Sequence, residues 1–235
     1  MTTSADARYA IYFVPAAQND LYQFGRSVLG YDCYTGTDIG LLDGLDQEFA
    51  NWREITDEPR RYGFHATLKA PFRLPPSCSE ATLTDAFDKF AKLDHPMVHI
   101  EPEITPLGNF IAIVPRRPTP ALDALANHCT TSFDLFRAPM IAKERTRRTV
   151  SHLSPSQMQN LDRWGYPFVF EDFRFHMTLT GPLQESVRDH VIAVLRRAFD
   201  RMCGKGEFAV DRLALVKQPD ELARFRVLCQ AELNR

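Results

Sequence analysis

Two stretches of this chain repeat one pattern, and that repeat most constrains what the chain folds into. Residues 61–72 read RYGFHATLKAPF, and residues 172–183 read DFRFHMTLTGPL. Aligned without gaps, they share Phe64/Phe175, His65/His176, Thr67/Thr178, Leu68/Leu179 and Pro71/Pro182. A repeat of about 110 residues is too long for a solenoid, so it predicts two similar lobes.

The same order of expected elements follows each stretch: an amphipathic helix, a strand, a turn and a second strand. These elements cover residues 79–91, 97–104 and 109–115 after the first stretch, and 187–202, 207–218 and 223–233 after the second. We therefore expect an α+β fold of two antiparallel-sheet lobes related by a pseudo-two-fold axis, with helices on the outer faces and a central cleft. Residues 1–235 are expected to form one bilobal domain, long enough to bury a sizeable core.

Strand parity gives each repeated stretch a polar face. Side chains of a strand alternate between its faces, so His65, Thr67 and Lys69 share one face and the apolar residues between them share the other. The second stretch places four polar residues on one face in the same way: Arg174, His176, Thr178 and Thr180. Hydroxyl donors, cations and two imidazoles are the groups that bind a phosphate and move protons on either side of it. A duplicated chain also keeps both histidines if the cleft only binds a ligand.

Three further features have both a functional and a structural interpretation. Lys69 and Arg174 are candidates to bind the substrate or a second phosphate, or they lie at solvent-exposed strand ends. Tyr12, opposite in parity to its apolar neighbours, either faces the cleft or packs as a buried aromatic. The run KERTRR, residues 143–148, is either a flap with phosphate-seeking arginines or a solvated charged surface.

Composition excludes several classes of protein. The formal net charge is −2, which argues against a partner such as long nucleic acid. The five cysteines contain no C-x-x-C pair, and the remaining histidines show no ligand-like grouping, so neither a disulfide frame nor a metal site is expected. The N-terminal residues 1–8 are polar, and no 18-residue apolar run occurs, so we expect a cytoplasmic protein without membrane association.

The paired motifs HATL and HMTL resemble the H-x-[ST]-hydrophobic signatures of the 2H phosphoesterase superfamily, which includes cyclic phosphodiesterases and RNA 2′,5′-ligase-like enzymes. The longer stretches RYAIYFVP, YGFHATLKAPF and WGYPFVFEDFRFHMTLTGPL resemble the branch encoded in bacterial phosphonate-utilisation operons. The resemblance spans nearly the whole chain, and both signatures are intact. It implies a bilobal α+β fold, the two motifs on neighbouring central strands, no metal and no cofactor. It also implies an active-site quartet of His65, Thr67, His176 and Thr178.

The resemblance and the residues together predict a cyclic phosphodiesterase that acts on a small phosphorylated ligand as a monomer. One neutral histidine would take a proton from water, and the other, protonated, would donate to the departing sugar oxygen. The two motifs are nearly equivalent, so the sequence does not assign the roles. Imidazole pKa values near 6.5 would give a bell-shaped rate profile. The alternatives are a non-catalytic module that binds a nucleotide or an RNA end, and a 2′,5′-RNA ligase-like enzyme.

Overall fold

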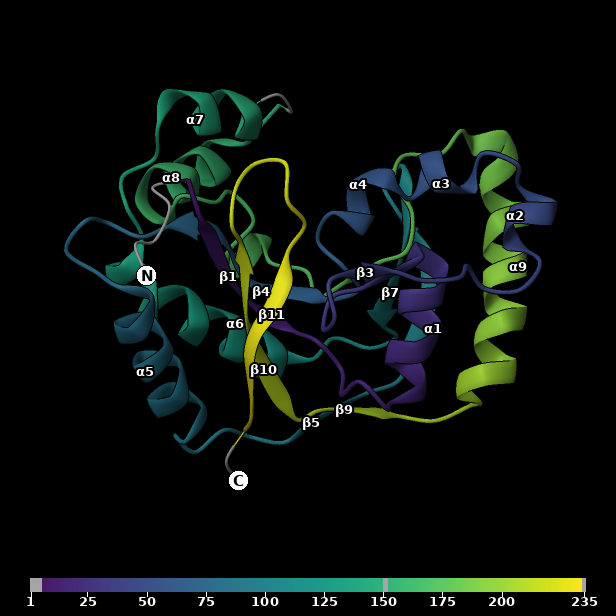
Figure 1. Ribbon diagram of the computed structural model, residues 1–235, viewed down its shortest axis with the longest axis horizontal. Helices are drawn as coiled ribbons and strands as arrows, with labels where there is room; N and C mark the ends of the chain where they lie inside the picture. The colour runs from purple at the N-terminus through teal and green to yellow at the C-terminus, as the bar shows by residue number, and fades with distance from the viewer. Residues whose placement is uncertain (1–5, 150–151, 234–235) are drawn as a thin grey trace.

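The computed structural model describes residues 6–149 and 152–233. Residues 1–5, part of the polar N-terminal stretch, lie outside the described residues. The centre of the structure is a seven-stranded antiparallel sheet with the order β11-β10-β1-β4-β8-β7-β6 (Figure 1). These strands are β1 (Arg8–Phe13), β4 (Ala66–Arg73), β6 (Pro102–Leu107), β7 (Phe110–Pro115), β8 (Met177–Thr178), β10 (Arg212–Gln218) and β11 (Arg226–Glu232). The antiparallel α+β fold is confirmed, with the strands of both expected lobes joined in one sheet.

The two repeats exchange their hairpins across the sheet. The β6–β7 hairpin, which follows the first histidine stretch, pairs with β8 of the second. The β10–β11 hairpin, which follows the second, pairs with β1, and β1 in turn pairs with β4 of the first. Helix α5 (Glu80–Ala91) packs against β10 and β11, whereas α9 (Glu185–Cys203) packs against β6. Each half of the sheet is thus built from both repeats, and the pseudo-two-fold axis stays a prediction.

The helices lie at both ends of the sheet. Figure 1 shows α5, α6 (Pro120–Ser132), α7 (Ala142–Arg148) and α8 (Pro155–Trp164) on one side, and α1 (Asp20–Leu29) and α9 on the other. Ser79 and Ser154 cap α5 and α8 through capping boxes, in which the serine hydroxyl accepts from the N3 backbone N–H. Within the described residues, no helix combines the length and apolar content that a membrane crossing requires.

The remaining elements are short. Residues 31–60, whose composition is typical of loops, contain β2 (Tyr31–Asp32), β3 (Thr37–Asp38), α2 (Leu45–Glu48), α3 (Trp52–Ile55) and α4 (Asp57–Arg60). The 3₁₀ turns are η1 (Asp134–Phe136) and η2 (Phe170–Asp172). The strand expected over residues 97–104 divides, because β5 (Val98–Ile100) leaves the main sheet to pair with β9 (Phe208–Val210).

The apolar residue before each histidine anchors its stretch in the core. Phe64 and Phe175 are both buried. A Cβ added to Gly25 of α1 would lie 2.1 Å from the Phe64 ring, so the missing side chain is what lets this ring pack against the helix. The buried Phe64 therefore holds the backbone of the adjacent His65 in place at the start of β4.

Candidate active site

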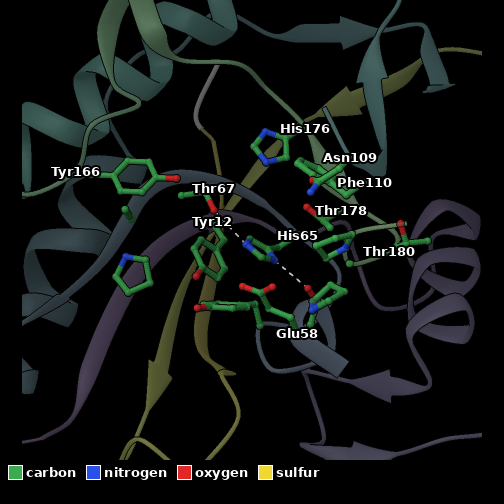
Figure 2. Close-up of a pocket in the computed structure, with 17 residues that line it drawn as sticks. Tyr12, Glu58, His65, Thr67, Asn109, Phe110, Tyr166, His176, Thr178 and Thr180 are labelled. Atoms are coloured by element: carbon green, nitrogen blue, oxygen red, sulfur yellow. Dashed lines mark hydrogen bonds between the residues drawn. The ribbon is translucent and has the colours of Figure 1, made fainter. Parts of the chain in front are cut away.

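A cavity of about 390 Å³ lies where the two halves of the sheet meet (Figure 2). Both motif histidines and both motif threonines line it: His65, Thr67, His176 and Thr178. Ten of its lining residues are labelled in Figure 2, and they include Tyr12 and Tyr166. The structure thus brings the four residues of the two motifs together in one place.

The strand register explains this meeting. The ladder between β4 and β8 aligns Ala66 with Met177, and each of these residues directly follows a motif histidine. In an antiparallel pair, the flanking positions then place His65 opposite Thr178 and Thr67 opposite His176. Figure 2 agrees, because the two imidazoles and two hydroxyls alternate around the cavity. Each histidine therefore lies beside the threonine of the other motif as well as its own.

Backbone carbonyls orient both imidazoles in the same way. His65 Nδ1 is 2.8 Å from the carbonyl oxygen of Gly63, and His176 Nδ1 is 2.7 Å from that of Arg174. A carbonyl oxygen only accepts hydrogen bonds, so Nδ1 carries the proton and Nε2 carries the lone pair in each neutral ring. Gly63 has φ 75°, in the left-handed region that favours glycine, so the turn that presents its carbonyl depends on this residue.

The Thr67 hydroxyl completes the contacts of the first histidine. Its Oγ1 lies 3.1 Å from His65 Nε2. Because Nε2 of the neutral ring is an acceptor, the hydroxyl donates in this bond. The hydroxyl is therefore held at the cavity by the imidazole of its own motif.

Burial changes the acid–base properties of both rings. Burial, together with the positive charge of His176, lowers the pKa of His65 to about 4 against the opposing hydrogen bond to Gly63. Burial also lowers the pKa of His176, and its bond to the Arg174 carbonyl opposes this shift. Both imidazole pKa values therefore lie below the expected 6.5, and that of His65 is low enough to keep this ring neutral at pH 7. A bound phosphate anion would raise both pKa values.

Tyr12 faces the cavity and also packs as a core aromatic. Its ring stacks on the His65 imidazole with centroids 3.8 Å apart and an interplanar angle of 23°. Burial raises the pKa of its phenol, so Tyr12 stays neutral. The contact covers one face of the His65 ring and so adds to the burial of that imidazole.

The structure places the two cations from the motifs elsewhere. Lys69 lies under α6, where its Nζ donates to the Thr130 carbonyl at 2.9 Å and lies 3.6 Å from Asp134 Oδ1. Burial lowers its pKa to about 8. Lys69 therefore links β4 to α6 and does not line the cavity.

Arg174 is exposed beside the second histidine. Its guanidinium donates to the Glu171 and Phe173 carbonyl oxygens at 3.0 Å and 2.6 Å. It lines a second, more apolar cavity of about 340 Å³, which adjoins the first and shares His176, Thr67 and other residues with it. Arg174 is thus near His176 but outside the first cavity.

Several lining residues have no signal in the motifs. They are Glu58, which precedes the first stretch, Tyr62 at its start, and three residues between the two stretches: Asn109, Phe110 and Tyr166. Their positions depend on how the segments fold over the sheet, although Tyr62 directly precedes the glycine of the first motif. Among the described residues, no group of three or more His, Cys, Asp or Glu side chains is arranged to hold a metal ion.

A family model described as "Protein of unknown function (DUF1045)" matches residues 67–226. The chain belongs to the DUF1045 family. The match begins at the threonine of the first motif and includes the whole second motif. This DUF1045 chain is also 33% identical to a protein named "Ribose 1,5-bisphosphate phosphokinase PhnN" from Janthinobacterium sp. (strain Marseille), over 93% of the chain and 49% of that protein.

A protein of the same name from Laribacter hongkongensis (strain HLHK9) is 33% identical, over 95% of the chain and 51% of that protein. The DUF1045 chain therefore spans about half the length of these curated relatives. Among solved structures, it is similar to E. coli LigT complexed with 3′-AMP, with a TM-score of 0.44, 13% identity and coverage of 98% of this chain and 99% of that one. The name PhnN agrees with the resemblance to the phosphonate-operon branch.

Proposed function

We propose that this DUF1045 chain is a phosphoesterase that opens a small cyclic phosphodiester by general acid and general base catalysis. The observation that carries the proposal is the matched pair of imidazoles in one cavity. Each has Nδ1 held by a carbonyl two residues earlier, which leaves Nε2 for proton transfer. Interleaved threonine hydroxyls supply the donors that a phosphate needs.

The unequal surroundings of the two rings support distinct roles. The positive charge of a protonated His176 is one cause that lowers the pKa of His65, so a single shared proton is expected on His176. We therefore assign His65 as the general base and His176 as the general acid. A phosphate anion in the cavity raises the pKa of His176 and keeps this ring protonated in the complex.

The reaction balances with water as the only co-reactant. His65 Nε2 takes a proton from a water molecule while the water oxygen forms a bond to phosphorus. The bond from phosphorus to one ring oxygen breaks, and His176 Nε2 gives its proton to that oxygen. The product is a phosphate monoester, and the proton on His65 returns to His176 through solvent. Thr67 and Thr178 donate to the non-bridging oxygens, where charge accumulates in the transition state.

A phosphorylated ribose is the substrate class that the relatives favour. The two PhnN relatives bear the name of a kinase of ribose 1,5-bisphosphate, and the chain matches about half of each. A cyclic phosphate of a phosphorylated ribose, linked to phosphonate metabolism, fits both this name and the chemistry of the two histidines.

Phosphorus NMR tests the proposal. Purified protein with a chelator is incubated with the four 2′,3′-cyclic nucleotides, ADP-ribose 1″,2″-cyclic phosphate and 5-phosphoribosyl 1,2-cyclic phosphate. We expect ring opening of at least one substrate, lost in His65→Ala and in His176→Ala. A folded wild-type protein that binds these compounds without opening any of them would contradict catalysis and support a binding module. A requirement for added metal would contradict the two-histidine mechanism.

A further inference from the structure

Arg148 contacts the wall of the active-site cavity, Arg8 packs on an aromatic ring next to it, and the charge of Arg147 acts on both. Within residues 6–149 and 152–233, the ion pairs of the structure include none made by Arg8, Arg147 or Arg148. The carboxylate of Glu144 is near, but it pairs with Arg73 at 3.3 Å. The cluster therefore has an excess of positive charge.

Arg148 is joined to the wall of the cavity. Its Nη2 donates to the Pro71 carbonyl at 2.8 Å, and its guanidinium lies 5.8 Å from the centroid of the Tyr166 ring. Both Pro71 and Tyr166 line the cavity. In the view of Figure 1, α7, which carries this arginine at its end, lies above α8 and the start of β1.

Arg8 approaches the cavity from the sheet itself. It is only 7% exposed, and its Nε donates to Gln218 Oε1 at 2.7 Å. Its guanidinium lies 5.5 Å from the Phe225 centroid, and Phe225 stacks on Tyr62 with centroids 5.3 Å apart. The Tyr62 ring is in turn 6.2 Å from His65. The rings of Phe225 and Tyr62 therefore lie between Arg8 and His65.

The positive charges of the cluster oppose one another. Burial, and next the charge of Arg147, lower the pKa of Arg8. Burial lowers the pKa of Arg148; Glu144 opposes this shift, and Arg147 and Arg8 add to it. Guanidinium groups keep their proton at neutral pH, so the repulsion between them persists at that pH. An anion between them would relieve it, and a phosphate matches the planar donors of arginine in shape and charge.

We propose that Arg8, Arg147 and Arg148 bind a second phosphate of the substrate, a monoester on the same sugar that carries the cyclic phosphodiester. This inference rests on the proposed function and adds the residues that select a phosphorylated sugar. The cyclic phosphate lies between the two histidines, the sugar lies along Tyr62 and Tyr166, and the monoester reaches the arginines. The run KERTRR thus contributes Arg147 and Arg148 to the second phosphate site. Its Arg145 instead forms an ion pair with Asp162 of α8.

Two substrates that differ only in the second phosphate test the subsite. They are 5-phosphoribosyl 1,2-cyclic phosphate and ribose 1,2-cyclic phosphate. We expect wild-type protein to prefer the phosphorylated one by roughly 10- to 100-fold in kcat/KM, the range of one charge-assisted hydrogen bond. Arg148→Gln and Arg8→Gln should remove most of this preference, because each should lower kcat/KM on 5-phosphoribosyl 1,2-cyclic phosphate much more than on ribose 1,2-cyclic phosphate. Arg147→Gln, at an exposed position where folding is not at risk, should remove part of it.

Arg145→Gln is the matched control, since it removes one positive charge from the same helix but from an outward ion pair, and it should keep the preference. Binding of ribose 5-phosphate, measured by titration calorimetry, separates this inference from the proposed function, because that compound has no ring to open. Binding that the three variants weaken supports the subsite even if no cyclic phosphate is opened. A preference and an affinity that survive in all three variants would overturn it.

Discussion

The two histidine motifs are alike in sequence and unlike in surroundings. His65 precedes an eight-residue strand between two neighbours, stacks on Tyr12 and accepts a hydrogen bond from Thr67. His176 precedes a two-residue strand, and its closest described aromatic contact is the Phe110 ring at 5.9 Å. Within the described part of the chain, no hydrogen bond holds His176 Nε2. In both rings the hydrogen bond from Nδ1 to a carbonyl leaves Nε2 available for proton transfer. The unequal packing around the two rings gives them different proton affinities.

The largest test of this comparison removes each imidazole in turn. We expect His65→Ala and His176→Ala each to lower kcat by roughly 10²- to 10⁴-fold, the usual contribution of a general acid or base. An acyclic p-nitrophenyl phosphodiester of the same sugar then separates the roles, because its leaving group departs without a proton. On that substrate His176→Ala should regain activity to within about tenfold of wild type, and His65→Ala should not. The opposite pattern would reverse the assignment of acid and base.

The threonines provide the next largest effect. Thr67→Val and Thr178→Val keep the side-chain shape and remove a hydroxyl donor, so each should lower kcat by roughly 10²-fold, as for loss of an oxyanion donor. Thr67→Ser and Thr178→Ser, which keep the hydroxyl, are the matched controls and should retain most of the activity. Steady-state kinetics on the best cyclic phosphate measure both. Equal rates for the valine and serine variants would show that the hydroxyls do not bind the phosphate.

The pH dependence of stability tests the low pKa of His65. An imidazole with a pKa of about 4 in the folded protein and an ordinary value of about 6.5 when unfolded binds protons mainly in the unfolded state. Stability is therefore full above pH 6.5 and is lost as the pH falls towards 4, by about 2 kcal/mol from this one group between pH 7 and pH 5. Urea unfolding of wild type and His65→Asn at both pH values measures it. A loss of the same size in the variant would show that other groups cause it.

The sequence predicts the four central site residues because the repeat itself carries them. Parity places His65 and Thr67 on one face, and the antiparallel pairing of the two motif strands then brings His176 and Thr178 to them. The position of the Lys69 ammonium group depends on α6, which covers β4 beyond the cavity. No pattern within the motif predicts that this helix lies there.

The other features of the site that the sequence does not predict arise from packing between distant segments. Tyr166 lines the cavity and Arg148 contacts its wall, both from a region between the repeats, so their places follow from the tertiary fold. The second histidine strand is short because an extended backbone is a strand only where a neighbour pairs with it, and periodicity does not reveal the neighbour. The same holds for the pKa of His65, which depends on burial and on His176.

The smallest expected effect concerns why the pKa of His65 differs from that of His176. Tyr12 covers one face of His65 at a centroid distance of 3.8 Å, and nothing equivalent is this close to His176 among the described aromatic contacts. In Tyr12→Ala, water reaches that face, so the pKa of His65 should rise by up to about one unit while that of His176 stays nearly constant. Tyr12→Phe keeps the ring and should keep the low pKa of His65. Titration of the imidazole carbon protons by NMR follows both histidines at once, with His65→Asn and His176→Asn to assign the signals. A His65 pKa that is the same in Tyr12→Ala and Tyr12→Phe would show that the rest of the cavity, and not the stacked tyrosine, makes the two repeats different.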